Sequence, residues 1–236
     1  MIKTLTKEQL GKTIDQTLLS PTATFKDIDK LCVDAKKYHF AAVCINPSFI
    51  VSARKILAGT DVKICSVVGY PLGANTIETK VFEARDNIGK GADELDMVIN
   101  LGMIKSGNYS YIEREIGTVV NIIRREQMAE YNKNINIKII IETGILTREE
   151  VEKVCRIGEE SGADFIKTST GFGVRGVDLD DVRLIREVVT RNIGVKASGG
   201  IRTFRDAQAL IDAGATRLGT SNGISIIEEY AKIFNK

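Results

Sequence analysis

The sequence predicts an α/β protein, a (β/α)8 TIM barrel with an extra N-terminal helix, and three observations support this fold class. Short apolar, β-branched runs alternate with longer helical patterns, as in repeated βα units around a parallel sheet. Eight such units can be counted, at a mean spacing of roughly 29 residues. A length of 236 residues suits one barrel better than two average domains, so residues 1–236 are expected to form a single domain.

The expected strands and helices follow one another along the whole chain. The strands are predicted over residues 14–19, 41–46, 63–68, 94–100, 137–142, 164–168, 194–197 and 216–219. Helices are predicted over residues 28–38, 48–57, 81–89, 109–131 and 151–161, and the extra helix over residues 6–12. Helix start signals precede four of them: Thr24 with Asp27, Pro47, Thr76 with Thr79, and Thr147 before two glutamates.

The composition argues against several classes of partner. Basic and acidic residues are nearly balanced, 33 against 31, and are scattered along the chain. Because only 6% of residues are aromatic and none is Trp, we expect no nucleic-acid partner. Since no run of about 18 apolar residues occurs, no membrane contact is expected. The charged start without an apolar run predicts a cytoplasmic location.

Residue types that bind metals or form catalytic triads are scarce. Cys32, Cys44, Cys65 and Cys155 lie far apart without a Cys-x-x-Cys pair, so we expect reduced, mostly buried thiols. His39 is the only histidine and ends a polar helix, which disfavours histidine metal sites and triads with a histidine base. No metal site is therefore expected, and the chemistry must use lysines and carboxylates.

Three polar residues in otherwise apolar strands are candidates for catalysis, because a barrel's active site lies at the carboxyl ends of its strands. Lys167 lies in the sixth predicted strand, Lys196 in the seventh and Asp96 in the fourth. A single lysine in a strand is more often an exposed edge residue or a salt-bridge partner. Both faces of a parallel strand are normally buried, however, and two buried lysines on adjacent strands would be costly without a function.

A close pair of lysines can produce a nucleophile. Two ammonium groups a few ångströms apart disfavour each other's charge, and burial adds to the effect, so one amine can lose its proton near neutral pH. Only the neutral amine attacks a carbonyl carbon. Asp96 would keep the net charge tolerable and could pass protons through a water molecule.

Two glycine-containing segments, residues 198–202 and 219–223, follow the last two predicted strands. Barrels commonly bind phosphate in these loops, through backbone N–H groups and a helix N-terminus. Arg202 could add a charged contact, and Gly171 after the sixth strand could extend the cradle. The alternative is that Gly199 and Gly200 only form a tight turn.

Residues 171–176 match the G-x-G-x-x-G pattern of dinucleotide-binding proteins and lie between a predicted strand and a helix. In that pattern the strand is the first of its domain and is apolar. Here it is the sixth strand and carries Lys167. Nicotinamide binding by a dehydrogenase is therefore a minor alternative.

Six segments together resemble the deoxyribose-phosphate aldolase family in order and context, over almost the entire chain. They are IDQTLL at 14–19, AVCINP at 42–47, ELDMVIN at 94–100, IETG at 141–144, FIKTSTG at 165–171 and VKASGGIR at 195–202. The resemblance implies reversible cleavage of 2-deoxy-D-ribose 5-phosphate to acetaldehyde and D-glyceraldehyde 3-phosphate. It implies no metal or organic cofactor, and small phosphosugars and aldehydes as binding partners. A homodimer is compatible with it.

The resemblance also assigns roles to individual residues. Lys167 is similar to the Schiff-base lysine, Lys196 to the lysine that perturbs it and assists proton transfer, and Asp96 to the proton-relay carboxylate. The matching substrate-binding positions are Asp15, Thr17, Cys44 and Thr170, and the matching phosphate cradle is Gly171, Gly199, Gly200, Arg202, Gly219 and Ser221.

The chain departs from the family pattern at three places. Gln16 stands where many relatives have His, but strand alternation turns it away from the pocket that Asp15 and Thr17 face. Asn222 replaces a Ser that often follows Ser221. The sequence ends at Lys236 without the Tyr-ended tail of some relatives, so a lower turnover is expected.

Two rival functions remain open at the level of the sequence. Another phosphosugar barrel enzyme, such as an isomerase with Glu142 as base, would form no covalent adduct with its substrate. A non-catalytic phosphosugar sensor would bind the sugar and release no aldehyde.

Overall fold

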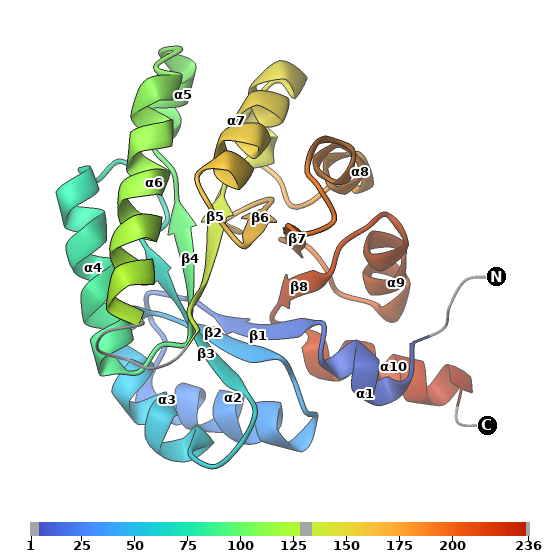
Figure 1. The fold of residues 1–236 in the computed structure, drawn as a ribbon. Helices are drawn as coiled ribbons and strands as arrows, with labels where there is room; N and C mark the ends of the chain where they lie inside the picture. The colour runs from blue at the N-terminus through green and yellow to red at the C-terminus, as the bar shows by residue number, and fades with distance from the viewer. Residues whose placement is uncertain (1–4, 128–133, 235–236) are drawn as a thin grey trace.

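Eight parallel strands form a closed barrel in the computed structural model, which describes residues 5–127 and 134–234 (Figure 1). Each strand pairs with the next along the chain, and β8 closes the barrel on β1. The strands are β1 (Ile14–Leu18), β2 (Ala42–Ile45), β3 (Lys63–Val68), β4 (Glu94–Val98), β5 (Asn136–Ile140), β6 (Phe165–Lys167), β7 (Gly194–Ser198) and β8 (Arg217–Thr220). The predicted fold class is therefore confirmed.

The predicted strand bounds agree with the structure to within one or two residues, and those of β3 agree at both ends. The fourth predicted strand is too long because Asn100 caps a short helix, accepting a hydrogen bond from the backbone of Met103. The fifth is too long because Glu142 adopts a left-handed backbone, with φ of +52°. Both residues have left the sheet to begin the loops at the mouth of the barrel.

Helices surround the barrel and connect its strands (Figure 1). They are α1 (Lys7–Gly11), α2 (Phe25–Lys37), α3 (Ile50–Leu57), α4 (Ile77–Lys90), α5 (Leu101–Lys105), α6 (Tyr109–Glu126), α7 (Arg148–Glu160), α8 (Leu179–Val188), α9 (Phe204–Asp212) and α10 (Gly223–Phe234). Two short 3-10 turns, η1 (Pro47–Phe49) and η3 (Thr143–Ile145), follow β2 and β5. The extra helix α1 packs beside α10, near both ends of the chain.

Side-chain caps fix where the helices begin. Thr24 and Thr147 form reciprocal hydrogen bonds with Asp27 and Glu150, the capping-box arrangement. Because the chain becomes helical directly after these caps, α2, α4 and α7 begin three or four residues earlier than the apolar pattern predicts. The helix predicted over 109–131 is present up to Glu126, and residues 128–131 of that prediction lie outside the described residues.

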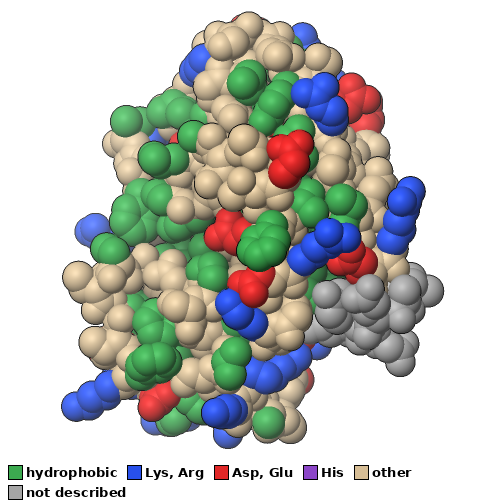
Figure 2. Space-filling view, turned by 90° about the vertical axis from the view of Figure 1, so that its left-hand side faces the viewer, with side chains coloured by type: hydrophobic (Ala, Val, Ile, Leu, Met, Phe, Trp, Pro, Cys, Tyr) green, Lys and Arg blue, Asp and Glu red, His purple; other side chains and the backbone are tan. Residues whose placement is uncertain are grey.

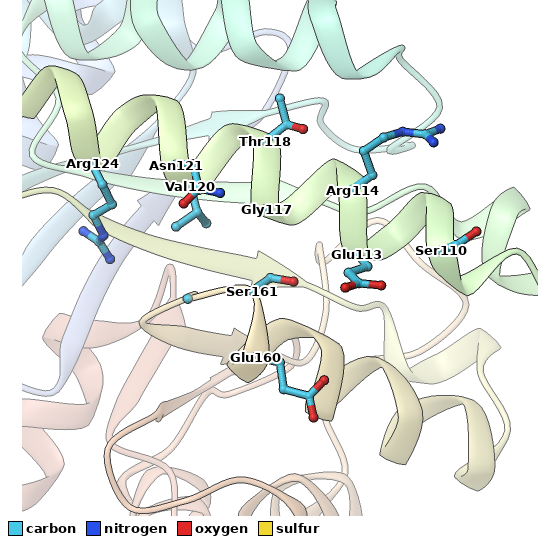
Figure 3. A pocket seen from close by; sticks show the side chains of 11 residues that line it. Ser110, Glu113, Arg114, Gly117, Thr118, Val120, Asn121, Arg124, Glu160 and Ser161 are labelled. Atoms are coloured by element: carbon cyan, nitrogen blue, oxygen red, sulfur yellow. The ribbon is translucent and has the colours of Figure 1, made fainter.

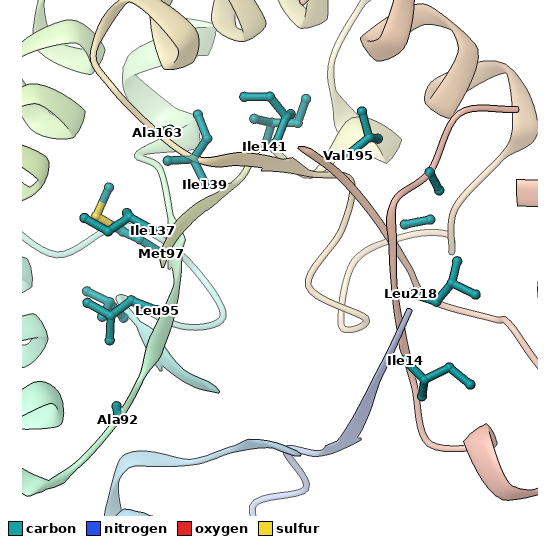
Figure 4. Packing of buried hydrophobic residues seen from close by; sticks show 14 of the residues in the cluster. Ile14, Ala92, Leu95, Met97, Ile137, Ile139, Ile141, Ala163, Val195 and Leu218 are labelled. Carbon is teal, nitrogen blue, oxygen red and sulfur yellow. The ribbon is translucent and has the colours of Figure 1, made fainter. Parts of the chain in front are cut away.

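The main apolar core lies between the barrel and its helices, not inside the barrel. Leu95, Met97, Ile139, Val195 and Leu218 point outwards from their strands into this layer (Figure 4). Alternation along each strand sends the neighbouring residues inwards, where Asp96, Lys138, Lys167 and Lys196 are buried. The barrel interior is thus unusually rich in charged groups.

On the face shown in Figure 2, basic and acidic side chains lie next to one another without a large area of either sign. Within the described residues, no helix combines the length and apolar character needed to cross a membrane.

Candidate active site

A cavity of about 440 Å³ opens at the carboxyl ends of the strands. Nine of the predicted site residues line it: Thr17, Lys167, Thr170, Gly171, Gly199, Gly200, Arg202, Gly219 and Ser221. The other four predicted residues, Asp15, Cys44, Asp96 and Lys196, are fully buried behind this lining. The structure therefore brings all the predicted residues to one end of the barrel, in two layers.

Lys167 and Lys196 are register partners on β6 and β7. Their ammonium nitrogens each lie 2.7 Å from Oδ2 of Asp96 on β4. The two lysines are thus adjacent, as the sequence predicts, but a carboxylate oxygen lies between them. Of the two, only Lys167 reaches the cavity.

The charges of the inner layer are set by competition between burial and ion pairing. Burial alone would lower the pKa of Lys196, but the carboxylates of Asp15 and Asp96 outweigh it and raise that pKa well above its ordinary value. Burial would raise the pKa of Asp96, but Lys138, Lys167 and Lys196 hold it well below its ordinary value. At neutral pH Lys196 is therefore a cation and Asp96 an anion.

Lys138 on β5 is a third buried lysine of the site, and it is absent from the predicted set. Its Nζ lies 2.6 Å from Oε2 of Glu94, 3.0 Å from Oδ1 of Asp96 and 3.3 Å from Sγ of Cys65. Despite burial, Asp96 in particular raises the pKa of Lys138 well above its ordinary value. A sequence signal existed, since Lys138 interrupts an apolar run at an inward-facing position, as Lys167 does.

Arg217 on β8 completes a continuous ionic network inside the barrel. Its Nη1 lies 2.7 Å from Oδ1 of Asp15 and 3.3 Å from Oε2 of Glu94. Burial would raise the pKa of Asp15, but Arg217 and then Lys196 outweigh it and hold that pKa well below its ordinary value. Each carboxylate of this network therefore contacts at least two cationic side chains.

Two groups of buried side chains have the ligand types that a metal ion would need. They are Cys44, Cys65 and Asp96, and Asp15, Cys65 and Glu94, whose ligand atoms lie within 4.8 Å of one another in each group. Every carboxylate in these groups already contacts an ammonium or guanidinium group. Lysine and arginine side chains of this chain thus supply positive charge to the carboxylates of both groups.

The loops after β7 and β8 meet at the cavity, as the glycine pattern predicts. Gly199 and Gly200 have φ of +97° and +80°, a backbone region that other residues rarely adopt. Helix α10 begins at Gly223, directly after the Ser221 loop. Backbone N–H groups beside a helix N-terminus favour an anion such as phosphate.

Gln16 supports the second of these loops from behind. Its side chain points away from the cavity, as expected. Nε2 donates a hydrogen bond to the carbonyl of Ser221, and Oε1 accepts one from the N–H of Gly223, both at 3.0 Å. The Ser221 hydroxyl donates to Oδ1 of Asn222 at 3.0 Å. The residue that departs from the family pattern thus holds both ends of the Ser221 loop.

Glu142 has a structural use that fits poorly with a role as catalytic base. Its carboxylate accepts hydrogen bonds from the N–H and the hydroxyl of Thr170. The carbonyl of Thr170 accepts the hydroxyl of Tyr70 at 2.7 Å, and Tyr70 lines the cavity. Tyr70 lies in a loop without a sequence pattern, so the sequence contained no signal for it.

The G-x-G-x-x-G segment, residues 171–176, forms a loop that does not open a helix, since α8 begins only at Leu179. A side chain at Gly176 would place its Cβ 2.5 Å from the carbonyl oxygen of Gly199. The glycine is therefore needed for the packing of two loops of the cavity, which explains the pattern without a dinucleotide.

A larger hollow of about 690 Å³ lies on the outside of the barrel, where α6 approaches the end of α7 (Figure 3). Its charged lining includes Glu113, Arg114 and Glu160, which are exposed to solvent. Solvent screens such exposed groups, and they lack the buried ion pairing that surrounds Lys167. We therefore assign the active site to the smaller cavity.

Comparison with known proteins agrees with this geometry. The model of the DeoC/LacD family of aldolases matches residues 11–228. Deoxyribose-phosphate aldolase from Caldanaerobacter subterraneus subsp. tengcongensis is 53% identical over 223 residues, which cover 94% of each chain. The enzyme of that name from Clostridium perfringens is 50% identical over 222 residues, covering 94% of this chain and 96% of that one.

A solved structure shows the same relationship in three dimensions. The deoxyribose phosphate aldolase from Aeropyrum pernix, described as a tetramer, superposes with a TM-score of 0.87 at 33% sequence identity, covering 97% of this chain and 93% of that one. From the matched family model and these relatives, we conclude that the chain belongs to the DeoC/LacD family of aldolases.

Proposed function

We propose that this protein is a deoxyribose-phosphate aldolase, which cleaves 2-deoxy-D-ribose 5-phosphate reversibly to acetaldehyde and D-glyceraldehyde 3-phosphate through a lysine Schiff base. The observation that carries the proposal is the position of Lys167. Its amine lies in the wall of the cavity, 2.7 Å from an Asp96 oxygen that also contacts Lys196. The two relatives described above, from Caldanaerobacter subterraneus and Clostridium perfringens, are both named deoxyribose-phosphate aldolase.

Lys167 is the proposed nucleophile because the other two buried lysines of the site, Lys138 and Lys196, are held as cations. The pKa values of Lys196 and Lys138 are both raised, mainly by nearby carboxylates acting against burial. Neutral Lys167 attacks the C1 aldehyde of the open-chain sugar, and loss of water leaves an iminium. Lys196 and Lys138 then act as fixed positive charges beside the reacting amine.

The iminium accepts the electron pair of the C2–C3 bond when that bond breaks. The C3 hydroxyl loses its proton as this bond breaks, and Asp96 can receive the proton through a water molecule because its carboxylate is held ionised. D-glyceraldehyde 3-phosphate departs and leaves an enamine on Lys167. Protonation at C2 and hydrolysis release acetaldehyde, and synthesis reverses these steps.

The proposed phosphate cradle lines the same cavity as this amine. Backbone groups at Gly199 and Gly200, the loop around Ser221 and the side chain of Arg202 line the cavity together. Asp15, Thr17, Cys44 and Thr170 are the proposed contacts or supports for the sugar. The cradle would hold the phosphate while the C1 aldehyde reaches Lys167.

Borohydride trapping tests the Schiff base directly. Incubation with acetaldehyde and borohydride should add one ethyl group at Lys167, because a reduced imine is a stable secondary amine. Lys167→Met should abolish the adduct, whereas Lys55→Met, at an exposed lysine on α3, should leave it unchanged. An adduct at another lysine, or no adduct in the native protein, would contradict the assignment and favour a non-catalytic sugar-binding barrel.

Charge reversal tests the phosphate cradle. Ser221→Glu and Gly200→Glu each place an anion where the phosphate is proposed to bind. Each should raise KM for the phosphorylated substrate by roughly tenfold or more, about 1.4 kcal/mol, while acetaldehyde trapping at Lys167 changes little. If both variants keep the preference for phosphorylated over unphosphorylated sugar, the cradle lies elsewhere.

We also propose a cytosolic homodimer. Phe25, Val33 and Val51 are exposed apolar residues on the neighbouring helices α2 and α3, a surface suited to self-association. The four cysteines are buried free thiols, the state that a reducing compartment maintains. Analytical ultracentrifugation of the native protein and Val33→Glu tests the assembly, since a monomeric native protein would exclude it.

A further inference from the structure

Two cysteines of the active site lie side by side on neighbouring strands. Cys44 on β2 and Cys65 on β3 are register partners, and both side chains point into the barrel. Neighbouring strands are about 4.8 Å apart, within the Cα separation of roughly 4.4–6.8 Å that a disulfide spans. The two sulfurs lie within 4.8 Å of each other and of an oxygen of Asp96.

The surroundings of the two thiols differ in a way that suits stepwise oxidation. The contact with Cys65, helped by the charges of Lys196 and Lys167, lowers the pKa of the Cys44 thiol despite burial. Burial, together with the contacts to Cys44 and Asp96, raises the pKa of Cys65 well above its ordinary value. Cys44 is therefore the better nucleophile toward an oxidant, and Cys65 lies beside it.

We propose that Cys44 and Cys65 form a reversible disulfide with peroxide, an oxidative modification site inside the active site. The Cys44 thiolate attacks one peroxide oxygen, the O–O bond breaks, and the thiol proton leaves with the other oxygen as water. Cys44 is then a sulfenic acid. The Cys65 sulfur attacks it, the S–O bond breaks, and a second water carries away the oxygen and the Cys65 proton. Two thiols are oxidised and one peroxide is reduced to two waters.

Peroxide can reach this pair by the path that the substrate takes. The aldehyde must reach Lys167, whose Nζ lies 2.7 Å from Oδ2 of Asp96. The same oxygen is 3.9 Å from Sγ of Cys44. Hydrogen peroxide is smaller than any aldehyde substrate, so a site open to the substrate is open to it.

The disulfide would change the contacts of the catalytic carboxylate. In the reduced protein, Sγ of Cys65 donates to Oδ1 of Asp96 at 3.1 Å and contacts Nζ of Lys138 at 3.3 Å. A disulfide sulfur has no proton to donate. Loss of a hydrogen bond to a buried charge corresponds to a fall in activity of roughly tenfold to a hundredfold.

Peptide mapping after peroxide treatment tests the bond itself. Trypsin separates Cys44 and Cys65 into peptides 38–54 and 64–80, each with a single cysteine. We expect these two peptides to appear joined under non-reducing conditions, with a mass lower by two hydrogen atoms than their sum. Aldolase activity should fall with the appearance of the joined peptide and return on addition of dithiothreitol.

Serine variants distinguish the pair from general oxidation. Cys65→Ser keeps a donor for Asp96 but cannot form the disulfide, so Cys44 should then react with a sulfenic acid probe such as dimedone. The control Cys32→Ser/Cys155→Ser changes the two cysteines outside the barrel interior, whose burial raises their pKa to about 12. It should inactivate as the native protein does. Inactivation without the joined peptide, or inactivation that this control prevents, would overturn the proposal.

Discussion

Lys167 and Lys196 face each other as register partners on adjacent strands, and both donate to a single oxygen of Asp96. The arrangement is asymmetric, because Lys196 has a second carboxylate partner, Asp15, and Lys167 has the open cavity. Of these two neighbouring amines, only Lys167 is therefore placed to reach a substrate in the cavity.

Replacing Lys196 should change the pH dependence of adduct formation. In Lys196→Leu, Asp96 loses one of its cations and pairs more strongly with Lys167, so borohydride trapping should reach its plateau at a higher pH. A displacement of two pH units corresponds to about 2.7 kcal/mol, or roughly a hundredfold less free amine at neutral pH. The measurement is the trapping rate against pH.

If the dependence of the trapping rate on pH is the same in Lys196→Leu as in the native protein, electrostatic activation of Lys167 is excluded. Trapping that recovers at high pH while turnover does not would show that Lys196 also transfers a proton.

Lys138→Met should destabilise the protein strongly, although Lys138 does not touch the cavity. The substitution leaves Glu94 and one oxygen of Asp96 buried without their closest ammonium group. Breaking a buried ion pair on one side costs about 3–5 kcal/mol in the free energy of unfolding. Urea unfolding measures this cost, and Lys63→Met, at an exposed lysine of β3, should change it by less than about 0.5 kcal/mol. A cost for Lys138→Met as small as that of the control would mean that water replaces the ammonium group.

Acid should destabilise the fold through Asp15 and Asp96, whose pKa values are held below their ordinary values because nearby cations outweigh burial. Their contribution is complete above the unfolded pKa of about 3.9 and is lost as pH falls below it, since the unfolded chain then binds more protons. The urea midpoint should therefore fall steeply below about pH 4. Asp15→Asn should flatten that slope, whereas Asp29→Asn, at an exposed residue, should not. Equal slopes in all three proteins would count against this linkage.

Gln16→Leu should weaken phosphate binding without preventing Schiff-base formation. The substitution removes two hydrogen bonds to the Ser221 loop, each worth about 1 kcal/mol, so KM for the phosphorylated substrate should rise by up to roughly thirtyfold. The trapping rate with acetaldehyde should stay nearly constant because Lys167 is untouched. Gln208→Leu is a suitable control, because the Gln208 side chain donates to Asp212 at the surface, away from the Ser221 loop. An equal loss in both KM and trapping would show a general loss of structure instead.

Most of the fold and the centre of the site could be predicted from the sequence because local patterns encode them. Alternation within each strand shows which side chains share a face, and polar residues such as Lys167 and Asp96 are conspicuous on a face that must be buried. The glycines after β7, Gly199 and Gly200, mark positions where the backbone takes a conformation that other residues rarely adopt. These signals depend on residues that are neighbours in the chain.

The missed residues depend on contacts that exist only when the barrel is closed. Arg217 meets Asp15 because β8 pairs with β1, the first strand of the chain. Tyr70 reaches Thr170 from a loop on the other side of the cavity. Strand alternation does indicate that Lys138 points inwards. Its partner Glu94 lies on another strand, however, so the sequence alone does not show whether Lys138 forms a salt bridge or takes part in catalysis.

The separation of a charged barrel interior from an apolar outer layer has a consequence for protein engineering. Residues such as Met97 and Ile139 pack between strand and helix, away from the ionic groups. Substitutions there can raise or lower heat resistance while the interior network keeps its arrangement. Variation of that layer is therefore the route by which one reaction centre could be adapted to cold or hot environments, whereas single replacements among the inner charges would impair stability and catalysis together.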